Sequence, residues 1–172
     1  MHEALLLGET RKRTEFGTWH TWKDMPIEEA LELTRDKFQP GVMYRDRWNP
    51  EGFAHSPVDP APDFARRVRT EIENNLGLPE RSPRLRYYTG VDGPVDSVGV
   101  DCWFEYTADD GQEIKILVDH TENPDKDNSN VDYIMLVNPD RDMDNGDGFE
   151  RFVGRASRAI VQKIEKKQTG AN

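Results

Sequence analysis

Residues 97–121 read SVGVDCWFEYTADDGQEIKILVDHT, and this stretch decides the fold. Apolar and polar residues alternate on both sides of the DDG at 109–111. That tripeptide is typical of a three-residue hairpin loop whose glycine is left-handed. Ala108 and Gln112 then close the loop. We therefore predict an antiparallel hairpin with two long strands.

The register of this hairpin follows from counting outward from its loop. Trp103 faces Leu117, and two residues further out Asp101 faces Asp119, about 5 Å apart at Cβ. The alternate face is almost wholly apolar and is predicted to face the core; its members are Val98, Val100, Cys102, Phe104, Tyr106, Ile114, Ile116 and Val118. Two directly opposed carboxylates repel each other, so the aspartate pair requires a compensating partner.

Several explanations fit an opposed aspartate pair. A divalent cation is one, because Mg²⁺ sites typically combine one or two carboxylates with water. A proton shared between the two carboxyl groups is another. A nearby arginine that neutralises the pair is a third, and a register shifted by one residue would remove the pair altogether.

The whole chain is predicted to form a single α+β or α/β domain. An amphipathic helix at 63–76 and a strand at 84–89 precede the hairpin. A strand at 131–137 and a helix at 149–167 follow it. This order predicts a central mixed four-stranded sheet, an antiparallel meander plus one strand, flanked by helices.

The first 62 residues are predicted to form an irregular N-terminal arm that packs on the body. It holds a helix at 26–38 followed by a Pro-rich loop. The WHTW segment at 19–22 is expected to be extended, with its tryptophans on the body, and a partner-docking role is the alternative. Residues 63–167 form the α/β core, and residues 168–172 are expected to be a disordered tail.

Charge and composition narrow the class of protein. The 172 residues carry a formal net charge of -10, which repels a phosphate backbone unless a basic patch overcomes it. Such a charge also suits a protein that docks on a basic partner or mimics nucleic acid. Cys102 is the single cysteine, no apolar run is long enough to span a membrane, and basic residues follow the first apolar run. These features predict a cytoplasmic protein with no membrane partner.

Two further charge patterns are an arginine cluster and an acidic segment. Six arginines cluster in sequence as the candidate basic patch, namely Arg66, Arg67, Arg69, Arg81, Arg84 and Arg86. Residues 140–147 carry carboxylates at alternate positions, as in a calcium loop. Asn145 and Arg151 stand where that loop has glycine and glutamate. We therefore expect a solvated acidic loop before the last helix, with a weak calcium site as the alternative.

The strings VGVD at 98–101 and ILVD at 116–119 resemble the core of the PD-(D/E)xK nucleases, the restriction-endonuclease-like fold. The resemblance covers about residues 63–165. It implies a helix, a three-stranded meander, a helix and a fourth strand. It also implies that the acidic pair binds Mg²⁺, or Mn²⁺ as a substitute, which activates water for phosphodiester hydrolysis. A glutamate from the preceding helix often joins the pair, and Glu71 is the best-placed match.

The chain departs from this family in two places. The family's lysine follows the second acid by two residues, but Thr121 stands there, so Lys126 in the following loop is the candidate to orient water. The link at 122–130 is too short and polar for the family's helix. The literal motif at 113–115 lies beside the turn, about 20 Å along the strand from the level of Asp101.

Three functional hypotheses follow. The first is a Mg²⁺-dependent nuclease in which Asp101, Asp119 and Glu71 hold the ion and Lys126 assists catalysis on nucleic acid. The second is a non-enzymatic acidic protein that binds a basic protein or blocks a nucleic-acid site by mimicry. The third is an accessory protein that docks through its Trp-rich arm. His120 is expected to be a core or edge histidine.

Overall fold

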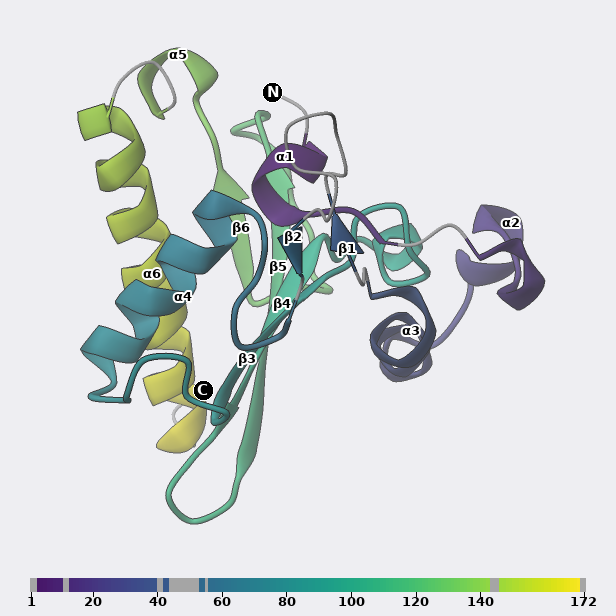
Figure 1. Cartoon of the computed structure of the whole chain (residues 1–172). Coiled ribbons are helices and arrows are strands. Elements are labelled where there is room, and N and C mark those ends of the chain that lie inside the picture. The colour runs from purple at the N-terminus through teal and green to yellow at the C-terminus, as the bar shows by residue number, and fades with distance from the viewer. Residues whose placement is uncertain are drawn as a thin grey trace.

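The elements follow one another in nearly the predicted order (Figure 1). The computed structural model describes residues 3–10, 13–39, 42–43, 53–54, 56–142 and 146–170. The helices are α1 (Glu3–Leu7), η1 (Thr14–Phe16), α2 (Trp19–Trp22), α3 (Ile27–Leu33), η2 (Thr34–Phe38), α4 (Asp63–Asn75), η3 (Asp96–Val98), α5 (Pro139–Asp142) and α6 (Gly146–Gln168). The strands are β1 (Val42–Met43), β2 (Phe53–Ala54), β3 (Leu85–Thr89), β4 (Cys102–Thr107), β5 (Glu113–Thr121) and β6 (Tyr133–Leu136).

The central sheet has the strand order β3-β4-β5-β6. β3, β4 and β5 form an antiparallel meander, and β6 pairs parallel with β5. β1 and β2 form a separate two-stranded ribbon. The prediction of a mixed four-stranded sheet in a single α+β domain is therefore confirmed.

The hairpin between β4 and β5 has the predicted loop, and its register is as predicted as far as Cys102 opposite Val118, where the ladder ends before it reaches Asp101 and Asp119. The N–H of Ala108 donates to the carbonyl of Gln112 at 2.9 Å, and Gly111 has a φ of 86°. Trp103 lies opposite Leu117. Turn chemistry alone therefore fixed the pairing of the two central strands.

The start of β4 differs from the prediction that Val98 and Val100 belong to the strand. The chain instead makes the helical turn η3, and Gly99 follows with a φ of 88°. This left-handed residue breaks the alternation of faces, so Val98 and Val100 pack on the face opposite to Cys102. The prediction that both valines share the face of Cys102 is therefore wrong.

Helices cover both faces of the sheet (Figure 1). α4 and α6 lie side by side on one face, where their apolar stripes and α1 enclose the main core. α3 covers the other face, where Ala30 and Leu31 pack in a smaller core with Tyr88 and Trp103. Within the described residues, no helix combines the length and the apolar character needed to cross a membrane.

The ends of α4 and α6 and the structure of the N-terminal arm differ in detail from the predictions. Pro62 precedes α4 as its N-cap, and Asp63 in the first turn pairs with Arg66 and Arg67. α6 extends through Gln168, into the expected tail. The WHTW segment forms the short helix α2, so the prediction that it is extended is wrong. Trp22 packs on Phe38 at 5.3 Å between ring centroids, whereas Trp19 is exposed. Most of the Pro-rich loop lies outside the described residues.

Candidate metal centre

The two aspartates singled out by the register lie at the end of the sheet opposite to the hairpin loop. The β4–β5 ladder ends with Cys102 opposite Val118, and Asp101 comes immediately before it. The backbone N–H of Asp101 donates to the carbonyl of Val118 at 2.9 Å. Its carboxyl Oδ2 accepts a hydrogen bond from the backbone N–H of His120 at 2.6 Å. The carboxyl group of Asp101 therefore lies against the last residues of β5.

A third acidic side chain reaches this place from the N-terminus. α1 lies at the same end of the sheet, opposite to the hairpin loop (Figure 1). Its Leu6 and Leu7 are buried in the main core, and the hydroxyl of Tyr87 donates to the carbonyl of Leu7 at 2.6 Å. This anchoring brings Oε1 of Glu3 within 2.8 Å of Nδ1 of His120.

Glu3, Asp101 and His120 form the candidate centre. Among the described residues they are the one group of three or more acidic, histidine or cysteine side chains whose ligand atoms converge, all within 4.8 Å of one another. Asp101 is 6% exposed and His120 is 7% exposed. Nε2 of His120 is also buried and has no hydrogen-bond partner in the described part of the chain. Carboxylate oxygen and imidazole nitrogen are both ligands of divalent metals in proteins.

Asp119 lies beside this centre but is paired differently. Its Oδ1 is 2.7 Å from Nζ of Lys126, and its Oδ2 accepts a hydrogen bond from the Asn128 amide at 2.8 Å. Asn128 also donates to the carbonyl of Gly99 at 2.8 Å, which ties the loop after β5 to the segment before β4. The Asp119 side chain is buried, whereas Lys126 is 38% exposed. The lysine therefore neutralises Asp119 and remains accessible from solvent.

Burial and mutual repulsion shape the protonation of the acids. Burial first, and then the charge of Glu3, raise the pKa of Asp101 to about 9. Burial likewise raises the pKa of Asp96 to about 6. The hydrogen bond to His120 outweighs burial at Glu3 and lowers its pKa. Asp101 therefore holds a proton at pH 7 unless a cation replaces that proton.

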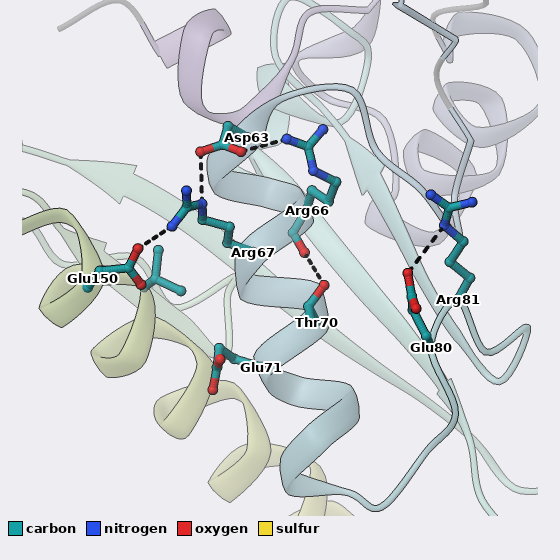
Figure 2. Close-up of a pocket in the computed structure, with 9 residues that line it drawn as sticks. Asp63, Arg66, Arg67, Thr70, Glu71, Glu80, Arg81 and Glu150 are labelled. Atoms are coloured by element: carbon teal, nitrogen blue, oxygen red, sulfur yellow. Dashed lines mark hydrogen bonds and ion pairs between the residues drawn. The ribbon is translucent and has the colours of Figure 1, made fainter. Parts of the chain in front are cut away.

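Glu71 lies elsewhere. It is exposed on α4 and lines a groove of about 520 Å³ between α4 and α6, together with Arg66, Arg67 and Glu150 (Figure 2). None of the three residues of the candidate centre lines that groove. The structure therefore does not bring Glu71 to Asp101 and Asp119. Glu3 is the acidic side chain that joins Asp101 in its place.

The expected basic patch is neutralised by carboxylates. Each of its six arginines forms at least one ion pair with an acidic side chain. Arg69 is buried against Glu73 at 2.9 Å, and Arg86 binds Glu105 at 3.2 Å. Acidic side chains therefore offset the charge of all six arginines.

The acidic segment before α6 also differs from its prediction as a solvated loop. Asp142 is 1% exposed and is bound by Arg141 and Arg155. Its Oδ2 also accepts a hydrogen bond from the backbone N–H of Asn138 at 2.9 Å. Residues 143–145 lie outside the described residues. Asp142, the last residue of α5, therefore has a structural role, because it holds the backbone of Asn138 just before this helix.

The sequence pointed to part of this centre. The hairpin register predicted that Asp101 and Asp119 lie at one end of the sheet, and Lys126 was the candidate from the following loop. In the structure, Lys126 contacts Asp119. The sequence did not point to Glu3, which has no local pattern to mark it, and His120 was expected to be a core or edge residue. A search of family models, of curated proteins and of solved structures found no match to this chain.

Proposed function

We propose that the chain binds a divalent cation at Glu3, Asp101 and His120 and hydrolyses phosphodiester bonds with it. The observation that carries the proposal is the convergence of two carboxyl groups and a buried imidazole within 4.8 Å. Mg²⁺, or Mn²⁺ as its substitute, is the ion that the resemblance to the PD-(D/E)xK nucleases implies. Such an ion supplies Lewis-acid chemistry, because it polarises a phosphoryl oxygen and lowers the pKa of water.

Lys126 is the side chain suited to hold a phosphate oxygen or a water molecule beside the centre. Asp119 anchors its ammonium group at 2.7 Å, and Asn128 fixes the other oxygen of Asp119. An ammonium group has three donors, so anchoring one of them leaves others for a substrate oxygen. Thr121 stands in the family's lysine position, and its hydroxyl accepts a hydrogen bond from the backbone N–H of Asn123.

A non-enzymatic acidic binding protein is the second candidate. The ion-paired arginines and the net charge of -10 favour it, because both weaken attraction to a nucleic-acid backbone. The partner in that case is a basic protein surface. The two candidates make opposite predictions about cation-dependent hydrolysis.

The test is hydrolysis of bis(p-nitrophenyl) phosphate and of DNA in Mg²⁺, Mn²⁺ or Zn²⁺. We expect Asp101→Asn and Glu3→Gln to lose at least about 100-fold in rate, because each removes a ligand of the ion. Matched controls are Asp110→Asn in the exposed hairpin loop and Glu71→Gln in the groove, which we expect to keep the wild-type rate. The Glu71→Gln variant also tests the sequence prediction that Glu71 is a ligand.

The outcomes separate the candidates. Hydrolysis that Asp101→Asn and the control variants retain equally originates outside this centre and refutes the proposal. A wild-type protein that binds the cation and cleaves neither substrate favours the acidic binding protein. A large loss in Glu71→Gln would move the catalytic site to the groove.

A further inference from the structure

We infer that the candidate centre selects a zinc-class transition-metal ion, Zn²⁺ with Co²⁺ as its spectroscopic substitute, over Mg²⁺. This inference rests on the proposed cation binding at Glu3, Asp101 and His120 and names the ion. It starts from one feature of the ligand set: a nitrogen donor, the buried imidazole of His120, stands among the carboxyl groups.

The donor chemistry distinguishes the two classes of ion. Mg²⁺ takes oxygen ligands in a near-octahedral shell and keeps several waters, so an imidazole adds little to its binding. Imidazole suits zinc, copper, iron and nickel. Zinc sites that perform catalysis use three protein ligands from His, Asp, Glu or Cys and leave one position open. A set of two carboxylates and one imidazole has this composition.

The spacing of the donor atoms fits a small ion. Oε1 of Glu3 lies 2.8 Å from Nδ1 of His120. This is the distance of a hydrogen bond, and two ligands about 2.0–2.1 Å from one tetrahedral zinc ion are about 3.3 Å apart, so the two atoms separate by about 0.5 Å when an ion replaces the proton between them. Asp101 is already fixed by the backbone N–H of His120 at 2.6 Å. The backbone of β5 therefore holds two of the three ligands in one rigid unit.

The unpartnered Nε2 of His120 is an independent indication of a ligand. Buried polar atoms nearly always have a hydrogen-bond partner, and this one has none among the described residues. Metal-bound histidines use one ring nitrogen for the ion and the other for a carboxylate or carbonyl. His120 uses Nδ1 for the carboxylate of Glu3 when no ion is bound, so the imidazole offers an ion either Nδ1, in place of that hydrogen bond, or the unpartnered Nε2.

The local charge favours a cation as well. Among the described residues, no lysine or arginine forms an ion pair with Glu3 or Asp101, because the nearby Lys126 is bound to Asp119. A doubly charged ion balances the two carboxylates when both are ionised. Cys102 next to Asp101 faces the main core and is 2% exposed, so it does not compete for the ion.

The experiment is calorimetric titration of the full-length, EDTA-treated protein with Zn²⁺, Co²⁺ and Mg²⁺. We expect Zn²⁺ to bind at least about 100-fold more tightly than Mg²⁺. His120→Gln should weaken Zn²⁺ by at least about 100-fold and Mg²⁺ by less than about 3-fold, since it removes the nitrogen donor. His20→Gln, which removes an exposed histidine of α2, is the matched control and should change neither affinity.

Two further measurements keep the result interpretable. Urea denaturation in EDTA establishes that His120→Gln is folded. The visible absorption of bound Co²⁺ reports a nitrogen ligand in wild type, and we expect Glu3→Gln and His120→Gln each to change it, whereas His20→Gln does not.

Each outcome has a distinct consequence. Equal affinities for Zn²⁺ and Mg²⁺ in a protein that hydrolyses phosphodiesters overturn the ion class and leave the proposed function standing. Tight, His120-dependent Zn²⁺ binding without hydrolysis supports the ion class and refutes the proposed function. Zn²⁺ binding that survives His120→Gln overturns the inference, whatever the His20→Gln variant does, and so does a protein that binds no ion.

Discussion

Asp101→Asn should flatten the pH dependence of stability in metal-free buffer. In the folded protein, burial and Glu3 raise the pKa of Asp101 to about 9, whereas the unfolded chain has a pKa of about 3.9. A raised pKa means that the folded state retains a proton that the unfolded state releases. The associated stability is complete below about pH 3.9 and is lost as the pH rises toward 9.

The magnitude follows from the proton difference. Between pH 5 and pH 8 the unfolded Asp101 is ionised and the folded one is protonated, so unfolding releases one proton. Each pH unit then lowers the free energy of unfolding by about 1.4 kcal/mol, or up to about 4 kcal/mol over the interval. Asparagine has no proton to release and can still accept the hydrogen bond from the backbone of His120. The free energy of unfolding of Asp101→Asn, relative to that of wild type, should therefore increase as the pH rises.

The assay is urea denaturation of both proteins in EDTA at pH 5, 6, 7 and 8. Asp110→Asn, at an exposed hairpin position, controls for the loss of an acidic residue. Asp96 and the histidines are present in both proteins, so the difference between Asp101→Asn and wild type reports on Asp101 together with Glu3, whose charge acts on it. Parallel stability profiles across these pH values would refute the reasoning. An added divalent cation should stabilise wild type most at pH 8, where the competing proton is scarcer, and should not stabilise the variant.

The remaining predictions concern the scaffold and are measured by the same denaturation assay. Arg69→Met should lower the free energy of unfolding by about 3–5 kcal/mol, because it leaves the buried carboxylate of Glu73 without its ion-pair partner. Arg66→Met, at an exposed ion pair, should lower it by less than about 1 kcal/mol. Equal losses in the two variants would contradict the burial argument. Gly111→Ala has open space but a φ of 86°, so it should cost about 1 kcal/mol. At Gly90 a Cβ would lie 2.4 Å from a backbone carbonyl oxygen, so Gly90→Ala should cost about 3 kcal/mol or more, and a smaller loss than at Gly111 would be inconsistent with the packing.

Local chemistry made the sheet predictable. The glycine at 111 and the alternation around it fixed the loop, the loop fixed the register, and the register brought Asp101 and Asp119 to one end. The start of β4 was missed because a positive φ at Gly99 cannot be read from the valines around it. A glycine inside an apparent strand is itself the signal of such a break.

The third member of the centre was not predictable from local pattern. Glu3 and His120 are separated by 117 residues and meet because α1 docks on the main core, which is a tertiary event. Glu71 was favoured because it lies beside the buried stripe of α4. A helical stripe, however, shows which face packs on the sheet and not which end of the sheet a neighbouring residue approaches.

Paramagnetic broadening by Mn²⁺ tests the cation site most directly. In the amide spectrum of the ¹⁵N-labelled protein, substoichiometric Mn²⁺ should broaden Asp101 and His120 first, because an ion held by their side chains lies within a few bonds of those amides. The same titration of Asp101→Asn should lose that pattern. Broadening centred on the groove around Glu71 or on the acidic segment at 140–147, or no localised broadening, would contradict the account.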